Sequence, residues 1–310
     1  MKWKKLGLIF TAEMYNSWMN SHAQVPTVMN LGDTLRVFFS TRDKNGTSRV
    51  AFLDVEARNP LKIEKVHETP VLDVGNAGCF DEHGVMPSCI VSNPSDSNET
   101  FLYFSGWSRR LEVPYCNLAG IAKSNNGVSF DRLGDGPVLT TKIHEPYSAT
   151  SPFALMGKDQ HVMYYSSGTS WATINGKLEH TYNIRKAISD DGINWHQLNE
   201  VCIEQKYPEE AVTRPSILVK NKVFHMWFCY RGSRNFRDGA DSYRIGYAYS
   251  HNGINWIRDD AQAGITVSKS GWDANMVAYP YIATTQYGDY MFYNGNGFGR
   301  SGFGVAVLEV

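Results

Sequence analysis

Three copies of one short turn decide the fold: Ser124-Asn-Asn-Gly-Val-Ser-Phe130, Ser189-Asp-Asp-Gly-Ile-Asn-Trp195 and Ser250-His-Asn-Gly-Ile-Asn-Trp256. Each copy follows a short run of small and apolar residues, such as Gly120-Ile-Ala-Lys123. Asn-Gly or Asp-Gly between two β-like runs indicates a hairpin, because these residues accept a positive φ at little cost. The repeat therefore predicts a chain built from similar β-units.

A second marker extends the repeat over the whole chain. An apolar run opens at each of five prolines, Pro26, Pro87, Pro152, Pro215 and Pro280, at spacings of 61, 65, 63 and 65 residues. An aromatic-rich run, a third β-like run and, in the first four units, a more polar fourth run come after each proline. No stretch carries a sustained apolar stripe of helical period. Five four-stranded units of about sixty residues are typical of β-propeller blades.

The ends of the chain predict how the ring closes. The fifth unit ends at Val310 after three β-like runs, while a spare run, Trp3 to Phe10, precedes the first unit. We expect this run to complete the last blade and so to cover both sheet edges. The sequence thus predicts an all-β fold of one domain, residues 1–310. That domain is a five-bladed β-propeller of four-stranded antiparallel blades, the last closed by the N-terminal strand.

Composition and charge narrow the class of function. The chain is 42% hydrophobic and 20% charged, with a net charge of −1, so nothing marks a nucleic-acid or membrane surface. Five cysteines without a CxxC pair predict free thiols rather than a disulfide framework or a zinc site. The N-terminal apolar run is too short for a signal peptide or a membrane span, which predicts a cytoplasmic protein. The 8 Trp and 17 Tyr suit strands and also stacking on sugar rings.

The alternating direction of the strands predicts where a site lies. In an antiparallel blade, the loop before the first strand and the loop between the second and third strands share one face, opposite the Asn-Gly hairpins. The hairpins repeat, whereas the loops of the first face differ in every unit and are rich in polar residues. Concave loop surfaces on a rigid scaffold are the usual binding sites. Around the propeller axis, the loops of this face are expected to form a central funnel. The substrate-binding candidates in it are His22, Arg42, Asp43, Glu82, His83, Trp107, Arg109, Trp171, Arg214, Arg231, Asp273, Tyr279 and Asn294.

Several candidates also have a structural interpretation. Glu210 and Arg214 could form an ion pair as easily as a substrate clamp, and Asp81 could belong to a turn. His22 and His83 stand at the same offset before their prolines, which favours a repeated inward position, but two histidines alone do not make a metal site. The sequence predicts no cofactor and leaves a metal ion in the channel open.

On these turns and proline-led inner strands, the chain resembles the five-bladed β-propeller superfamily of glycoside hydrolases. That superfamily includes arabinanases and xylosidases, invertases and levansucrases, and mannoside phosphorylases. The resemblance implies acid/base catalysis by two carboxylates. It implies the catalytic candidates Asp81, which matches a family acidic position, and Glu145 and Glu210, either of which could be the general acid. The segment Trp18-Met-Asn-Ser21 resembles the invertase Trp-Met-Asn-Asp segment with Ser21 in place of the Asp, so a conventional first-blade nucleophile is missing.

Three hypotheses for function follow. The first is a glycoside hydrolase or phosphorylase that cleaves a glycosidic bond of an oligosaccharide in the funnel, by an inverting or phosphorolytic reaction. The second is a glycosyl- or group-transferase of glycan biosynthesis acting on an activated sugar, and the third is a non-catalytic carbohydrate-binding propeller. Phosphate is a candidate partner, because arginine binds oxyanions bidentately. Arginines expected on the funnel face are Arg42, Arg109, Arg110, Arg214, Arg231 and Arg234.

Overall fold

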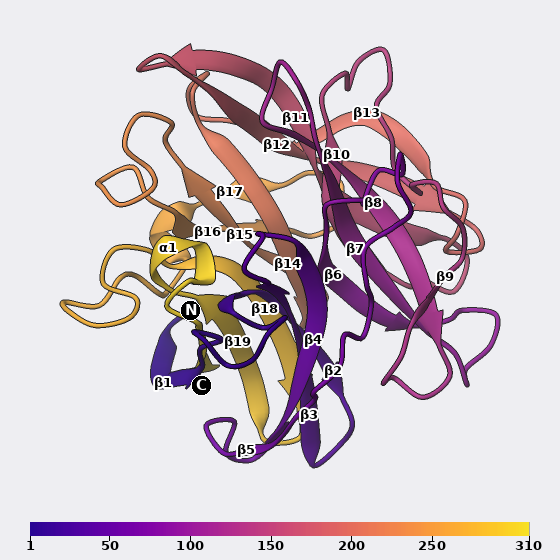
Figure 1. Cartoon of the computed structure of the whole chain (residues 1–310), viewed down its shortest axis with the longest axis vertical. Coiled ribbons are helices and arrows are strands. Elements are labelled where there is room, and N and C mark those ends of the chain that lie inside the picture. Colours follow the sequence, from indigo (N-terminus) through magenta and orange to yellow (C-terminus); the bar gives the residue numbers. More distant parts are fainter. Residues whose placement is uncertain (310) are drawn as a thin grey trace.

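Five antiparallel blades surround a central axis in the structure, a computed structural model that describes residues 1–309 (Figure 1). Blade 1 contains β2 (Ser21–Asn30), β3 (Thr34–Arg42), β4 (Ser48–Glu56) and β5 (Ile63–Val66). Blade 2 contains β6 (Gly84–Ser92), β7 (Thr100–Arg109), β8 (Tyr115–Ser124) and β9 (Asp131–Arg132). Blade 3 contains β10 (Ala149–Leu155), β11 (His161–Ile174), β12 (Lys177–Ser189) and β13 (His196–Ile203). Blade 4 contains β14 (Ala211–Lys220), β15 (Val223–Arg231), β16 (Arg244–Ser250) and β17 (Ile257–Arg258).

The fifth blade joins the two ends of the chain, as the sequence predicts. It contains β18 (Ala278–Thr285), β19 (Gly288–Asn294), β20 (Phe303–Leu308) and the N-terminal strand β1 (Trp3–Phe10). Strand β1 runs antiparallel to β20, with Trp3 opposite Leu308 and Phe10 opposite Phe303, and Figure 1 shows the two termini side by side. The predicted five-bladed β-propeller and its closure are confirmed.

Two short helical pieces interrupt the strands within residues 1–309. They are a 3-10 turn at Asp260–Gln262 and α1 (Asn296–Gly299). No helix within residues 1–309 is long and apolar enough to cross a membrane.

The three repeated turns share one hydrogen-bond pattern. The hydroxyl oxygens of Ser124, Ser189 and Ser250 each accept a bond from the N–H of the glycine three residues later, at 2.9, 2.9 and 3.0 Å. Those glycines have φ values of 63°, 74° and 68°, which a residue without Cβ adopts readily. The repeated residues thus build identical turns on the face opposite the funnel.

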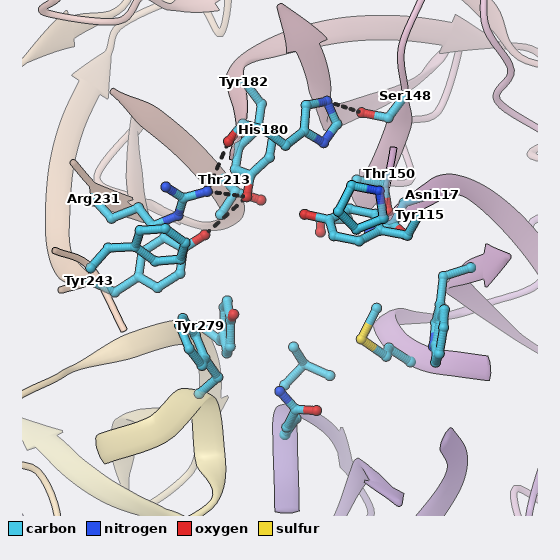
Figure 2. Close-up of a pocket in the computed structure, with 18 of the residues that line it drawn as sticks. Tyr115, Asn117, Ser148, Thr150, His180, Tyr182, Thr213, Arg231, Tyr243 and Tyr279 are labelled. Carbon is cyan, nitrogen blue, oxygen red and sulfur yellow. Dashed lines mark hydrogen bonds between the residues drawn. The ribbon is translucent and has the colours of Figure 1, made fainter. Parts of the chain in front are cut away.

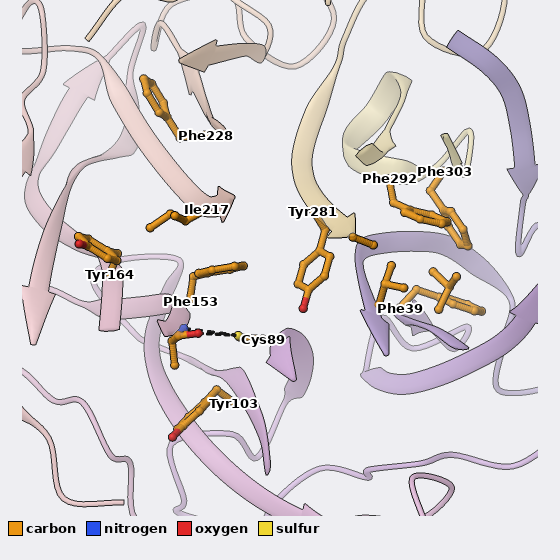
Figure 3. Packing of buried hydrophobic residues seen from close by; sticks show 14 of the residues in the cluster. Phe39, Cys89, Tyr103, Phe153, Tyr164, Ile217, Phe228, Tyr281, Phe292 and Phe303 are labelled. Atoms are coloured by element: carbon orange, nitrogen blue, oxygen red, sulfur yellow. Dashed lines mark hydrogen bonds between the residues drawn. The ribbon is translucent and has the colours of Figure 1, made fainter. Parts of the chain in front are cut away.

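Side chains fill the axis of the propeller below the funnel. Cys89, Phe153, Ile217 and Tyr281 come from the inner strands of blades 2 to 5, and all are at least nine-tenths buried. Figure 3 shows them pointing toward one another, and the rings of Phe153 and Tyr281 are 5.9 Å apart. Close packing of this kind makes the funnel a closed pocket rather than a through-channel.

A backbone bulge recurs where the inner strands reach the funnel floor. The residue before the proline has a positive φ in four blades: 51° at Val25, 52° at Ser151, 60° at Arg214 and 54° at Tyr279. Strand register shifts at each of these places. Positive φ is uncommon outside glycine, and strained positions of this kind gather at functional sites. The repeated prolines therefore mark the floor of the funnel.

Candidate functional site

The funnel encloses a pocket of about 470 Å³, within the ~300–1,000 Å³ usual for small-molecule sites. Every blade contributes to its lining. The residues from blades 1 and 2 are His22, Gln24, Val25, Arg42, Met86, Trp107, Pro114, Tyr115 and Asn117. Those from blades 3 to 5 are Ser148, Thr150, Ser151, Trp171, Leu178, Glu179, His180, Tyr182, Thr213, Arg231, Phe236, Arg237, Tyr243, Tyr279 and Phe298.

Aromatic side chains form much of the wall. The Trp171 indole stacks on His180 at 4.3 Å and 10°, and the Tyr115 ring meets Trp171 edge-on at 5.2 Å. Across the pocket from Tyr115, the Arg231 guanidinium is close to Tyr182 and Tyr243 (Figure 2). Rigid aromatic faces offer apolar contact area at little cost in conformational entropy, which suits a flat cyclic ligand.

Five buried polar atoms of the lining have no hydrogen-bond partner among residues 1–309. They are Gln24 Oε1, Arg42 Nε, Asn117 Oδ1, Thr150 Oγ1 and His180 Nδ1. A buried polar group without a partner costs about 1–3 kcal/mol, so most native groups of this kind are paired. They are five of the ten such atoms among residues 1–309, and the grouping of these five in one pocket favours a polar ligand there. The set includes donors and acceptors, so a ligand with several hydroxyl groups fits it best.

The charges of the lining are unbalanced toward positive. Arg42, Arg231 and Arg237 line the pocket together with a single carboxylate, Glu179. Arg237 binds both Glu179 oxygens at 2.7 and 3.1 Å, so these two charges compensate each other. Arg231 is 3% exposed and donates to the carbonyls of Gly232 and His180 and to two hydroxyls, all uncharged. Within the described part of the chain, Arg42 and Arg231 therefore leave two positive charges without a carboxylate partner.

Both histidines of the lining are held neutral. Burial, followed by the nearby Arg42 and Arg300 guanidinium groups, lowers the pKa of His22 from 6.5 to about 4. Burial and then Arg231 lower the pKa of His180 from 6.5 to about 3. Neutral imidazole nitrogens can accept or donate one hydrogen bond each, so at neutral pH they add polarity and no further charge.

The long β11–β12 hairpin positions one side of the pocket. It turns at Asn175-Gly176, with φ values of 52° and 76°, and brings Trp171 and His180 over the funnel. Gly168 permits this arrangement. A Cβ there would lie 2.5 Å from His180 Nε2 and 2.6 Å from the hydroxyl of Ser148.

Six residues predicted from the sequence as substrate-binding do line the pocket: His22, Arg42, Trp107, Trp171, Arg231 and Tyr279. They come from the first or the second strand of their blades. The direction of the strands in an antiparallel blade was the signal that found them.

The three residues predicted as catalytic lie elsewhere. Asp81, Glu145 and Glu210 are at most 2% exposed and do not line the pocket. Asp81 binds Arg132 of β9 at 2.6 Å, and both Glu210 oxygens bind Arg258 of β17 at 2.7 and 2.8 Å. Glu145 accepts hydrogen bonds from the hydroxyl of Tyr165 and, at 3.2 Å, from Gln197 of β13.

Asp273, predicted as substrate-binding, takes the corresponding position in blade 5. It binds Lys5 of β1 at 2.5 Å and Tyr293 at 3.0 Å. In blades 2 to 5, then, an acidic side chain before the inner strand ties the loop to the outermost strand of the same blade. We call these four contacts the clasps. These carboxylates, that of Asp81 through one oxygen only, hold blades together and do not line the pocket, which corrects the predicted placement at the funnel.

Other predicted residues also have structural partners instead of a place in the pocket lining. Asn294 is fully buried. Its side chain accepts a hydrogen bond from the N–H of Val25, at the bulge in β2, and donates to the carbonyls of Ala23 and Gly302. Arg214 is buried below the pocket, where it bonds Thr27 and carbonyls of blades 1 and 2.

The remaining predicted residues lie outside the pocket. Asp43 binds Arg49 and two N–H groups of its own turn. The Glu82 carboxylate accepts a hydrogen bond from the N–H of Gly78, the His83 ring lies 5.9 Å from that of Trp107, and Arg109 is exposed.

Sequence analysis missed the polar residues that lie within strands. Asn117, Thr150, His180 and Tyr182 are strand residues, whose side chains face the funnel only in one register. The Asn175-Gly176 pair was a usable signal for the long hairpin, because Asn-Gly favours such tight turns. No group of three or more His, Cys, Asp or Glu side chains within residues 1–309 is arranged to hold a metal ion.

Comparisons with known proteins extend over the full chain. No protein-family model matches it. The uncharacterized protein Rv1502 of Mycobacterium tuberculosis is 33% identical over 311 residues, covering 100% of both chains. The chain belongs to the same family. A second relative, the uncharacterized protein MT1551 of that organism, shows the same identity and coverage.

Solved structures of similar fold are five-bladed propeller glycoside hydrolases. A structure described as an RGII complex of BT0996 matches 98% of this chain and 90% of its own, with a TM-score of 0.75 and 16% identity. A Bombyx mori GH32 β-fructofuranosidase in complex with sucrose matches 93% and 61%, with a TM-score of 0.62 and 14% identity. A structure described under the GH130 family of mannoside phosphorylases matches 99% and 93%, with a TM-score of 0.68 and 15% identity. At these identities the likeness establishes the fold.

Proposed function

We propose that the protein is a carbohydrate-active propeller whose central pocket binds a sugar. The five unpartnered polar atoms of the lining carry this proposal, because donors and acceptors that lie side by side in an aromatic pocket match a ring that bears hydroxyl groups. The structurally similar proteins in complex with sucrose and with RGII add support at the level of the fold.

Binding to a panel of neutral and acidic sugars, measured by calorimetry, tests this proposal. Asn117→Ala removes an acceptor that has no partner within the described chain, so the variant keeps its fold and loses about tenfold in affinity. Asn125→Ala is the matched control, because Asn125 is exposed in a hairpin turn on the opposite face. Equal affinities in the two variants would contradict a sugar site at Asn117.

Hydrolysis by two carboxylates has the least support among the predicted reactions. It needs two carboxyl groups about 5–9.5 Å apart, one on each side of the bond. The lining has Glu179 alone, and that carboxylate is bound to Arg237. Phosphorolysis and transfer from an activated sugar need fewer carboxylates, because an anionic phosphate is the attacking or the leaving group. We therefore propose phosphorolysis or glycosyl transfer as the reaction class.

Product analysis separates these reactions from simple binding. Oligosaccharides are incubated with and without inorganic phosphate, and activated sugars with and without an acceptor sugar. Release of a sugar phosphate only when phosphate is present indicates phosphorolysis, and acceptor-dependent loss of the activated sugar indicates transfer. Tight binding without any product would favour the non-catalytic carbohydrate-binding propeller.

A further inference from the structure

One guanidinium group of the pocket has no acceptor of its own. The side chain of Arg42 makes no hydrogen bond and no ion pair with any residue from 1 to 309, and its Nε is buried without a partner. Arg36, Arg132 and Arg258 are also only partly exposed, and each binds an aspartate or glutamate. A desolvated charge is normally paired, so the missing partner of Arg42 is expected from outside the chain.

The carboxylate next to Arg42 in the chain is already engaged elsewhere. Asp43, the next residue, binds Arg49 at 3.0 Å and also accepts bonds from the N–H groups of Asn45 and Thr47. Burial lowers the pKa of Arg42, as expected for a cation without an anionic partner. The arginine is held at the end of β3, where its carbonyl accepts from the Asn20 N–H at 2.9 Å.

Further positive charge surrounds this end of the pocket. Besides burial, the charges of both Arg42 and Arg300 act on His22 and lower the pKa of its imidazole. Burial raises the pKa of the Tyr279 hydroxyl on the pocket floor, and the nearby charges of Arg231 and Arg42 both oppose this rise. The two arginines that have no carboxylate partner among residues 1–309 therefore both act on the part of the pocket around Tyr279. This part of the lining is suited to a group that carries negative charge and several acceptor oxygens.

We propose that Arg42 binds an oxyanion group, phosphoryl or carboxylate, so that the substrate is an acidic or phosphorylated sugar, or a neutral sugar bound together with phosphate. This inference rests on the proposed carbohydrate site. The planar guanidinium forms bidentate bonds with either oxyanion, and these charge-assisted bonds are stronger than those to a neutral hydroxyl. The neutral polar groups of the lining, Asn117, Thr150 and His180, then bind the hydroxyl groups of the ring.

Calorimetric titration of four classes of ligand tests the proposal. The probes are neutral hexoses, the corresponding 1- and 6-phosphates, glucuronate and galacturonate, and inorganic phosphate. We expect at least one acidic class to bind about tenfold or more tightly than its neutral parent, the contribution of a charge-assisted hydrogen bond. If inorganic phosphate alone binds and tightens a neutral sugar, the oxyanion is free phosphate. If only the attached group has this effect, the substrate is the acidic sugar.

Variants assign the effect to Arg42. Arg42→Gln removes no hydrogen bond and no ion pair within residues 1–309, and it should abolish the preference for the acidic ligand while weak binding of the neutral sugar remains. Arg42→Lys keeps the charge but lacks the planar pair of N–H donors of a guanidinium, and should retain part of the preference. Arg110, predicted on the funnel face, is exposed and does not line the pocket, so Arg110→Gln is the matched control and should bind as the wild type does.

The outcomes separate this inference from the proposed function. Neutral and acidic sugars binding equally to the wild type, or an acidic preference that persists in Arg42→Gln, would overturn the oxyanion site and leave the carbohydrate site intact. Phosphate binding that depends on Arg42, with no sugar bound, would support the oxyanion site and overturn the carbohydrate site. No binding of any probe would overturn both.

Discussion

The clasps and the funnel both hold charges that are withdrawn from water, but they treat them in opposite ways. In the clasps, the carboxylates of Asp81, Glu210 and Asp273 each meet a cation of the outermost strand. In the funnel, Arg42 and Arg231 meet no carboxylate of residues 1–309. A charge paired within the chain holds the fold together, whereas a charge left unpaired at a pocket is available to a ligand.

Removal of one partner from a clasp should have the largest effect. Arg258→Met leaves the Glu210 carboxylate, which is 1% exposed, with only a backbone N–H partner. The loss of free energy of unfolding should be about 3–5 kcal/mol, measured by urea denaturation. Arg234→Met is the matched control, because Arg234 is exposed, its partner Glu209 is only partly buried, and the pair should contribute less than about 1 kcal/mol. Similar losses in the two variants would remove the distinction between clasps and surface pairs.

The neutral histidines of the funnel should make stability depend on pH. In the unfolded chain a histidine has a pKa of about 6.5, above the folded values of His22 and His180. As the pH falls below 6.5, the unfolded state therefore binds protons first and the folded state loses stability. The loss continues to a pH of about 4 for His22 and about 3 for His180. At pH 5 it should reach about 2 kcal/mol for each histidine.

Urea denaturation at pH 7.5 and at pH 5.0 measures this loss. His22→Gln should reduce the difference between the two pH values by about 2 kcal/mol. His144→Gln, at an exposed position, should leave the difference unchanged. An unchanged difference in His22→Gln would show that the imidazole is protonated in the folded protein.

Arg42→Gln should change stability in the opposite direction to the clasp variant. The guanidinium loses water on folding and gains no acceptor from residues 1–309, so its removal should raise the free energy of unfolding of the ligand-free protein by about 1 kcal/mol. Arg36→Gln is the control, because it breaks a bidentate pair with Asp54 and should lower stability. A loss in Arg42→Gln as large as that in Arg36→Gln would mean that Arg42 has a structural contact.

The contrast between local and distant contacts explains which parts of the fold could be predicted from the sequence. The blades were predictable because turns and prolines act locally: Ser189-Asp-Asp-Gly192 forms its turn through its own side chains. The clasps were not, because Asp81 and its partner Arg132 are 51 residues apart, and Arg132 lies in a strand of two residues without any pattern. An acidic residue at the funnel mouth and one in a clasp look alike until the partner is known.

The funnel was predictable in its loops and less so in its strands. Arg42 and Trp171 were found because strand direction sends the ends of second strands to one face. His180 and Asn117 were missed, because which side of a strand faces the pocket depends on register. That the Arg42 side chain lacks a partner is a property of the whole structure, since it depends on where every carboxylate lies.

The smallest effect is expected at the first blade, where the corresponding contact is neutral. The indole N–H of Trp18 donates to the Glu68 carbonyl, just after β5, at 2.9 Å, and no carboxylate takes part. Trp18→Phe keeps an aromatic ring against the core and removes this one hydrogen bond. The loss should be about 0.5–1 kcal/mol by urea denaturation, well below that of Arg258→Met, because no charge is left buried without a partner. A loss equal to that of Arg258→Met would show that a clasp stabilises its blade through packing of the loop, and that the charge of its carboxylate matters little.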